Sequence, residues 1–197
     1  MHLLYEEDGE LKVGTVLAAA AASYQIESPH GRRSKIKAAN VLLSFESPAA
    51  AQLLLAAQAY AAELDVDFLW QCAGSAEFGY ADLAREYVGR EPTPVEAAGA
   101  LLKLHGAPMY FYRRGRGRFQ AAPAETLKAA LSGLERKRVQ AEKVAEYAER
   151  LARGEFPPEL AGLRDELLYK PDRNRFEAKA VDAACKQTGA DAVHPGY

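Results

Sequence analysis

The stretch that most constrains the fold is residues 93–120, because it contains clear signals for where a helix begins and ends. Thr93 can cap a helix, Pro94 suits its first position, and Glu96 stands where a capping box requires a carboxylate. The helix is predicted to end at Gly106, with a proline two residues later that prevents it from continuing. The sequence therefore predicts one well-defined helix with a sharp end.

A short basic hairpin is predicted to follow this helix. Residues 109–112, MYFY, are aromatic in the manner of a strand, residues 113–118, RRGRGR, are typical of a turn, and Phe119 begins a return strand. The predicted turn contains no acid and has four positive charges, on Arg113, Arg114, Arg116 and Arg118.

Another helix is predicted just before Thr93. In residues 78–88, four apolar residues fall on one helical face: Leu83, Ala84, Tyr87 and Val88. Gly89 is predicted to end this helix. Two helices joined by so short a turn fit a helix-turn-helix, and the basic hairpin would be its wing. We therefore predict a winged helix-turn-helix domain over residues 47–122, although capped helix pairs with short turns occur in many folds.

Positive charge is concentrated locally, although the 197-residue chain has a formal net charge of −2 and a pI near 6.1. A polyanion would have to be bound by local patches, since the overall field does not attract it. Two stretches, 30–37 and 98–120, contain several cations and no acid. The candidate nucleic-acid-binding residues are Arg32, Arg33, Lys35, Lys37, Lys103, Tyr112, Arg113, Arg114, Arg116 and Arg118.

Residues 1–46 are predicted to form a small β module, with a barrel-like fold of the SH3 or OB type. Strand-like runs occur at 11–17, 24–27, 34–37 and 41–45. Lys35 and Lys37 alternate with Ile36, so both lysines should point to one side of a strand while the isoleucine enters the core. Such lysines can hold a polyanion, or they can simply guard an exposed edge against pairing.

The rest of the chain is predicted to be helical, which makes the fold class α+β. Ser47 and Pro48 are expected to open a core helix, and Trp70 should anchor a further short helix in the core. A long packing helix is expected within residues 123–156, where apolar residues recur every seven positions, and residues 157–197 should form a helical linker. The alternative for the long helix is a dimeric coiled coil, which an alanine-rich seam disfavours.

The sequence contains no catalytic constellation. Phosphate-binding loops, nucleophile elbows, zinc motifs and carboxylate clusters are all missing, and Asp65 and Asp67 are better explained as a helix cap. Cys72 and Cys185 match no metal or disulfide spacing, so reduced thiols are expected. There is no signal peptide or apolar run long enough to span a membrane, and we expect a cytoplasmic monomer without cofactors.

Binding is therefore the expected function. The helix at 94–105 offers only Lys103 and His105 toward base edges, so sequence-specific DNA reading is not expected from it. The basic turn and the lysine strand could hold a phosphate backbone instead. Three aromatic residues could stack a base if they are exposed, with core packing as the alternative: Tyr110, Tyr112 and Phe119.

A family resemblance is carried by three strings: YEED at 5–8, KVGTVL at 12–17 and, above all, HGRRSKIKAANVLLSFE at 30–46. They resemble the amino-terminal region of ribonuclease II family (RNB) exoribonucleases, in the bacterial branch where a small β module and a winged helix precede the catalytic domain. KPDRN at 170–174 and EAKAVDA at 177–183 resemble the connector that follows. The similarity covers most of residues 1–185 and includes no catalytic signature.

The resemblance implies processive, magnesium-dependent 3′ to 5′ hydrolysis of single-stranded RNA by a downstream domain whose aspartates hold the metal. None of those aspartates maps onto this chain, so these residues would guide RNA and would not cleave it. The final string, GADAVHPGY at 189–197, instead resembles a short string near the start of biotin carboxylase, too short to carry that enzyme. The chain ends without a helix cap or charged tail, so we expect a natural continuation past Tyr197.

Two other functions remain open from the sequence. The chain could be a winged-helix DNA-binding regulator, or it could be a protein-docking module that presents acids to a partner: Glu63, Asp65, Asp67 and Glu77. Binding of single-stranded RNA, compared with duplex DNA, separates the first of these from the RNA-guiding hypothesis.

Overall fold

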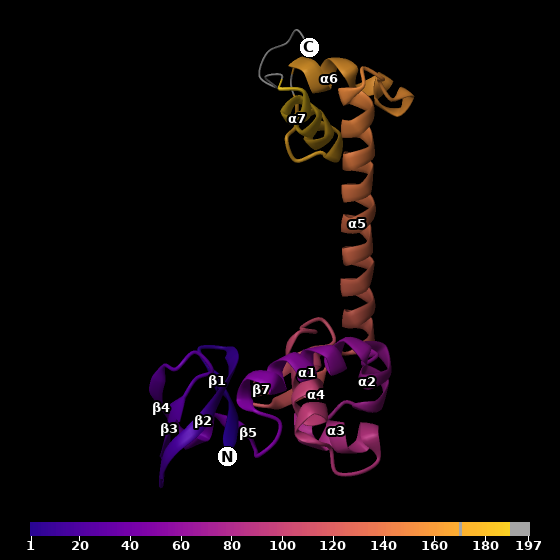
Figure 1. The fold of residues 1–197 in the computed structure, drawn as a ribbon. Helices are drawn as coiled ribbons and strands as arrows, with labels where there is room; N and C mark the ends of the chain where they lie inside the picture. The colour runs from indigo at the N-terminus through magenta and orange to yellow at the C-terminus, as the bar shows by residue number, and fades with distance from the viewer. Residues whose placement is uncertain (170, 190–197) are drawn as a thin grey trace. The chain divides into compact units, whose positions relative to one another are not determined.

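The computed structural model describes residues 1–169 and 171–189 and divides the chain into two compact units (Figure 1). The first unit is Met1–Leu127 and the second is Lys128–Tyr197. The structure is mixed α and β, with two antiparallel sheets, both in the first unit. Lys170, which begins the connector-like string, and residues 190–197, which hold most of the carboxylase-like string, lie outside the described residues.

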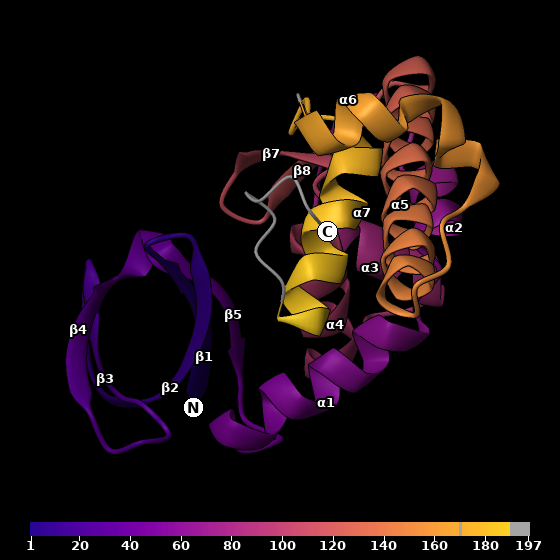
Figure 2. The ribbon, with the colours of Figure 1, turned by 90° about the horizontal axis from the view of Figure 1, so that it is seen from above.

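The first sheet has the strand order β4-β3-β2-β1-β5. Its strands are β1 (His2–Glu7), β2 (Glu10–Ala20), β3 (Ser23–Glu27), β4 (Arg33–Lys37) and β5 (Val41–Phe45), with the short 3-10 helix η1 (Ala38–Asn40) before β5. Four of these strands were expected from the sequence, whereas β1 was not. The sheet curls strongly (Figure 2), but the pairing leaves β4 and β5 as its two edges, so the described strands form no closed barrel.

A small core fixes which side of each strand faces inward. Leu3, Tyr5, Ile26 and Ile36 pack together inside the curl of the sheet. Gly14 allows close packing there, because a Cβ at this position would lie 2.7 Å from Cδ1 of Ile26. The buried Ile36 therefore sets the orientation of β4, and its neighbours on either side point to solvent.

The other elements of the first unit are four helices and a second sheet. They are α1 (Ala50–Glu63), α2 (Val66–Cys72), β6 (Glu77–Gly79), α3 (Tyr80–Val88), α4 (Pro94–His105), β7 (Phe111–Gly115) and β8 (Arg118–Ala121), and the strand order is β6-β8-β7. The largest core of the unit joins these helices to both sheets, through buried residues such as Leu4, Leu53, Leu101 and Phe111.

The predicted start of α1 was wrong by two residues. Ser47 does not cap the helix, and Pro48 follows it through a cis peptide bond. The first helical residue is Ala50, because Ala49 is still extended (φ −58°, ψ 151°) and its carbonyl accepts the first hydrogen bonds of the helix. The helix begins without a side-chain cap.

Helix α4 confirms the cap that was read from the sequence. The Thr93 hydroxyl accepts a hydrogen bond from the Glu96 amide, and the Glu96 carboxylate accepts one from the Thr93 amide. The middle of α4 is buried against α1, with Gly99 at the closest approach, where a Cβ would lie 2.6 Å from Cδ1 of Tyr60. Most of the surface of this helix is therefore used for packing.

Helix α3 and the turn of the hairpin are both shorter than expected. Helix α3 begins at Tyr80 and not at Phe78, because Phe78 pairs with Phe119 between β6 and β8. The predicted turn at 113–118 was also too long. Arg113 and Gly115 are still paired with β8, so only residues 116–117 turn, with Gly117 at a positive φ of 66°.

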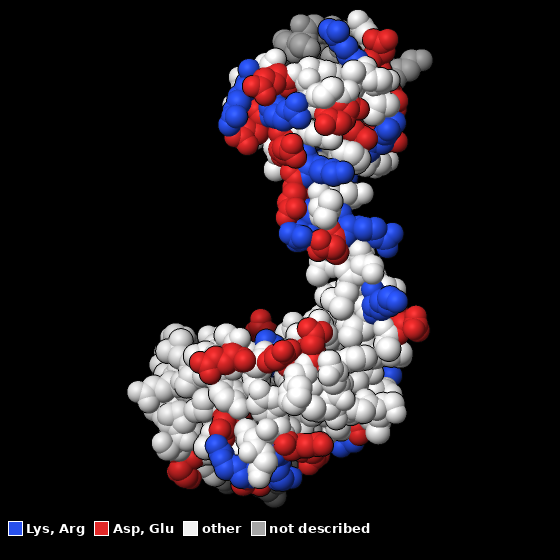
Figure 3. All heavy atoms as spheres, turned by 90° about the vertical axis from the view of Figure 1, so that its right-hand side faces the viewer, with Lys and Arg blue, Asp and Glu red and all other residues white. Residues whose placement is uncertain are grey.

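Helix α5 (Ala124–Ala152) begins in the first unit and continues into the second, as the long helix expected from the sequence. Its seven-residue pattern is not buried throughout, since Leu134 is 52% exposed. Figure 3 shows acidic and basic side chains close together along this helix, and Arg138 pairs with both Glu135 and Glu142. The middle of α5 is a solvated helix face.

The second unit packs the end of α5 against three short helical elements, η2 (Pro158–Leu163), α6 (Arg164–Tyr169) and α7 (Phe176–Thr188). Tyr147 stacks on Phe176, with ring centroids 6.3 Å apart, in a core that also contains Leu160. Arg175 bridges two acids, Glu166 and Glu177. Residues 157–189 are therefore a small packed cluster of helices.

Candidate nucleic-acid interface

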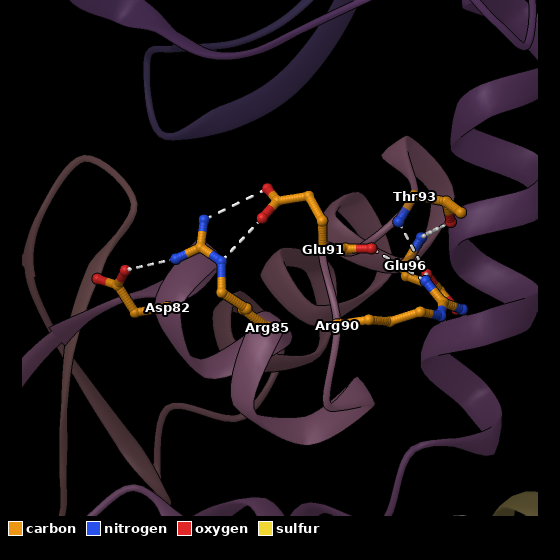
Figure 4. Close-up of polar contacts among 6 residues, drawn as sticks. All are labelled: Asp82, Arg85, Arg90, Glu91, Thr93 and Glu96. Carbon is orange, nitrogen blue, oxygen red and sulfur yellow. Dashed lines mark hydrogen bonds and ion pairs between the residues drawn. The ribbon is translucent and has the colours of Figure 1, made fainter.

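The turn between α3 and α4 is fixed by ion pairs (Figure 4). Arg85 Nε lies 2.9 Å from the Glu91 carboxylate, and Arg90 Nη2 lies 2.6 Å from the Glu96 carboxylate. The hydrogen bond from Arg90, together with that from the Thr93 amide, lowers the pKa of Glu96 to about 2. These arginines are already neutralised, so the turn offers little positive charge to a ligand.

The hairpin presents one polar face to solvent. Tyr112 is paired with Gln120, and because side chains alternate along a strand, Arg114 and Arg118 lie on that same face while Phe119 points into the core. Arg114 Nε donates to the side-chain oxygen of Gln120 at 2.8 Å, and its guanidinium lies over the Tyr112 ring, 5.9 Å from the centroid.

Two of the four hairpin arginines are held by carboxylates of the chain itself. Arg118 pairs with Glu77 of β6, and the hydrogen bond that the guanidinium donates to this carboxylate raises the pKa of Arg118. Arg113 pairs with Glu6 of β1. Both contacts are at the surface, where a competing anion can still displace them. The hairpin nevertheless carries less available charge than its sequence suggests.

The tip of the hairpin contacts the first sheet. Arg116 Nη1 lies 3.5 Å from the carbonyl oxygen of Ala39, which is two residues beyond Lys37 at the end of β4. A Cβ on Gly117 would lie 3.2 Å from Leu42 and 2.9 Å from Tyr80, so only glycine fits here without displacement. Arg116 of the hairpin tip and Ala39 of η1, 77 residues apart in sequence, are therefore in contact within one unit.

A buried tyrosine holds this junction together. The hydroxyl of Tyr80, on the first turn of α3, donates to the Leu42 carbonyl of β5 at 2.6 Å. Tyr80 is 7% exposed, and burial raises its pKa to about 12. This bond ties the helical part of the unit to the β module beside the hairpin tip.

Strand β4 carries three cations, Arg33, Lys35 and Lys37, that have no ionic partner among the described residues. Lys35 and Lys37 are exposed on either side of the buried Ile36, which is 2% exposed, as the alternation predicted. Within residues 1–169 and 171–189, neither these lysines nor Arg33 forms an ion pair. Arg32 is exposed in the preceding turn, where its backbone N–H donates to the Ser28 hydroxyl. Because β4 is an edge of the sheet, one side of this strand is open.

Lys103 is separate from these two segments. It lines a surface hollow of about 380 Å³ between α1 and the end of α4, together with Gln58, Val66 and Ala107. None of the other nine candidate residues lines that hollow. The structure thus places the hairpin tip against η1 and β5 and leaves Lys103 elsewhere.

The three candidate stacking aromatics differ in exposure. Phe119 is 1% exposed and packs with Phe78, so its role is in the core. Tyr110 is half-buried and packs beside Phe111, and its pKa is raised mainly by burial. Tyr112 is half-buried on the solvent face beneath Arg114, so it remains the hairpin aromatic that a ligand could reach.

Sequence reasoning missed two kinds of residue at this interface. The partners of the hairpin arginines, Glu6 and Glu77, lie on strands distant in sequence, and no local signal connects them to residues 113–118. Trp70 packs against the main core, as expected, but its ring is only partly buried, and its indole N–H donates to the Ala122 carbonyl at 2.8 Å. A lone tryptophan near the end of a short helix gives no indication of which side is exposed.

Within the described ranges 1–169 and 171–189, no three histidine, cysteine, aspartate or glutamate side chains gather in a way that could hold a metal ion. In that same part of the chain, no helix has the length and apolar character needed to cross a membrane.

Comparison with known proteins gives no relative. No protein-family model, no curated protein and no solved structure matches this chain.

Proposed function

We propose that the first unit binds the phosphate backbone of single-stranded RNA and guides the strand to a catalytic domain. In this proposal the chain is the N-terminal RNA-binding part of a ribonuclease II family 3′ to 5′ exoribonuclease, and hydrolysis belongs to a downstream magnesium-dependent domain. The observation that supports it best is the contact of Arg116 with the Ala39 carbonyl, because it holds the hairpin tip against η1, the short helix that directly follows β4.

The charges of these neighbours suit a polyanion. Arg33, Lys35 and Lys37 on β4 have no ionic partner among the described residues, and Arg114 and Arg116 on the hairpin contact only neutral groups. Cations that are not bound to carboxylates can replace the counterions of a nucleic-acid strand. Since the whole chain has a net charge of −2, these local cations would have to provide the attraction.

The fold assignment is part of the proposal. The order β6, α3, α4, β7, β8 and the pairing of β6 with β8 support a winged helix-turn-helix, in which β7 and β8 would be the wing. The curled five-stranded sheet would then be the small SH3-like or OB-like module that precedes it.

A winged-helix DNA regulator is the less favoured alternative. Such a protein places the second helix of the motif in the major groove, with polar side chains toward the bases. Here that helix is α4, whose buried residues include Ala98, Leu101 and Leu104, and its N-terminal Glu96 is acidic and paired. The helix has little free surface for base edges.

A protein-docking role through the acidic residues is also less favoured. Asp65 caps α2 by accepting bonds from the amides of Asp67 and Phe68, and Glu77 pairs with Arg118. These acids already serve the structure of the unit. Among the described residues, Glu77 is the member of that set that forms an ion pair, and Glu63 is an exposed acid without one.

Titration with single-stranded RNA and with duplex DNA, each at several salt concentrations, tests the proposal. We expect RNA to bind more tightly, and the Arg114→Ala, Arg116→Ala double variant to flatten the plot of log K against log salt by about 1.4, at roughly 0.7 per lost contact. Arg138→Ala is the control, because Arg138 is paired on α5 with Glu135 and Glu142. Tighter binding of duplex DNA, or an unchanged slope, would count against the proposal.

A further inference from the structure

A surface hollow lies beside the polar face of the hairpin. It has a volume of about 340 Å³ and is formed where the end of α2 meets the end of β8 and the first residue of α5, all within the first unit. Its lining is mainly apolar. The residues that matter for its shape are Trp70, Gly74, Ser75, Gln120, Pro123 and Ala124.

Trp70 forms an aromatic wall of this hollow. Its indole N–H is satisfied by the Ala122 carbonyl at 2.8 Å, so the orientation of the ring is set by the protein itself. The ring is only partly buried, unlike the core aromatics Phe111 and Phe119. The ring also packs against the main core, so it is an aromatic group held in place at the lining of the hollow, against which a planar group can stack.

Gln120 connects this hollow to the positive charge of the hairpin. Its side-chain oxygen accepts from Arg114 Nε at 2.8 Å, and its side-chain N–H donates to the Ser75 carbonyl at 3.0 Å. Both ends of the amide are therefore occupied, and the lining presents flat apolar surface more than open hydrogen-bonding groups. Arg114 does not line the hollow itself, but it is hydrogen-bonded to Gln120, which does. The terminal nitrogens of Arg114 are available to an anion.

We propose that this hollow receives one unpaired nucleobase of an RNA strand, stacked on Trp70, while Arg114 contacts a neighbouring phosphate. This inference rests on the proposed function, since it names how the RNA-binding unit recognises its ligand. The juxtaposition of an apolar aromatic slot with a guanidinium matches the two parts of a nucleotide, a flat base and an anionic backbone. An uncharged apolar molecule would gain no binding energy from the guanidinium of Arg114.

A base can enter such a slot only if it is neither paired nor stacked on its neighbours. The slot therefore selects single strands, whereas the cations of β4 and the hairpin attract any polyanion. Stacking on an indole accepts every base, so no strong sequence preference is expected from the slot. Preference for a single strand over a duplex is the consequence that distinguishes it from the basic surface.

The test uses the full chain and its intrinsic fluorescence, because Trp70 is the only tryptophan in the sequence. An oligouridylate is compared with an abasic RNA strand of equal length, which keeps the phosphates and lacks the bases. We expect the two strands to show the same salt slope, but oligouridylate to bind about 5- to 150-fold more tightly and to quench the fluorescence. The abasic strand should bind without quenching.

A slot-filling variant gives a second measurement. Ala124→Phe places a ring at the exposed first residue of α5, where it lines the hollow, and it should bring the affinity for oligouridylate down to that for the abasic strand. Ala129→Phe is the matched control, an exposed alanine on the same helix outside the hollow, and should change neither affinity. Circular dichroism of both variants verifies that the fold is kept.

The possible results separate the two proposals. If both strands bind equally, or quench equally, the base slot is wrong while the proposed RNA binding stands. If Ala124→Phe leaves the preference for oligouridylate intact, the slot is likewise wrong. If neither strand binds at any salt concentration, the proposed function itself fails, and the slot fails with it.

Discussion

The hairpin β7–β8 and the edge strand β4 are both rich in cations, but, among the described residues, carboxylates of the chain pair with two cations of the hairpin and with none of β4. In the hairpin, Arg113 is paired with Glu6 and Arg118 with Glu77. On β4, Lys35 and Lys37 have no ionic partner in the described part of the chain. Counting charges along the sequence therefore overstates the hairpin as a binding site and understates the strand.

The difference follows from where each segment lies in its sheet. The hairpin has β6 on one side and its tip against the first sheet, so acids from two other strands reach its arginines. Strand β4 has only one neighbour, β3, and the residues opposite Lys35 and Lys37 are Gln25 and Ser23. An edge strand thus keeps its positive charge available because few other side chains surround it.

The largest effect on RNA binding should come from removing the charge of β4. Arg33→Ala, Lys35→Ala and Lys37→Ala together should flatten the salt slope by about 2, since each lost phosphate contact on a single strand contributes about 0.7. Arg113→Ala with Arg118→Ala is the comparison, and should change the slope less, because those arginines are already paired. An equal or larger effect from the hairpin pair would reverse the comparison.

The second prediction frees the hairpin charges. Glu6→Gln with Glu77→Gln removes both carboxylates and leaves Arg113 and Arg118 unpaired, so RNA affinity should rise and the slope should steepen by up to about 1.4. Glu63→Gln is the control, because it removes one negative charge, against two for the pair, from an exposed residue without an ion pair in the described ranges. An equal gain per charge removed would mean that only net charge matters.

The third prediction weakens the contact between α3 and β5 beside the hairpin tip. Tyr80→Phe removes the hydroxyl that donates to the Leu42 carbonyl at 2.6 Å, and leaves that buried acceptor unsatisfied. We expect the free energy of unfolding to fall by about 1–3 kcal/mol in urea denaturation, with a smaller loss of RNA affinity. Tyr87→Phe, at a more exposed position of the same helix, should change neither quantity appreciably.

The elements with local signals were predictable from the sequence. The capping box of α4, its end at Gly106, the glycine after α3 and the alternation of Lys35, Ile36 and Lys37 are all as expected. Each depends on residues within a few positions of one another, so neighbouring residues alone determine the outcome.

The features that depend on distant residues were not predictable. Strand β1 is held by β2 and β5, and the short turn at Gly117 is set by pairing with β8 and by contact with Tyr80 and Leu42. The pairing of Arg113 with Glu6 spans 107 residues. At the candidate site, sequence identified which cations to consider, whereas only the folded chain decides which of them keep their charge available.

The smallest effect on RNA binding should come from Arg90, which lies outside both basic segments and is paired with an acid in the turn before α4. Arg90 pairs with Glu96, whose side chain is 16% exposed, and the pKa of that carboxyl is lowered to about 2. A depressed acid pKa stabilises the fold fully above its ordinary value of 4.5, and this contribution is lost as the pH falls toward 2. Arg90→Ala should raise the Glu96 pKa toward the ordinary value, without reaching it, because the Thr93 amide still donates to the carboxylate.

Carboxyl NMR titration of Glu96 measures this change, and unfolding experiments between pH 2 and 5 should show a smaller loss of stability on acidification in Arg90→Ala than in the parent chain. At neutral pH the RNA salt slope of Arg90→Ala should equal that of the parent, because the arginine is already bound to an acid. A flatter slope would place the α3–α4 turn against the RNA backbone. In that case paired arginines would contribute to binding as fully as unpaired ones, and the contrast between the hairpin and β4 would lose its meaning.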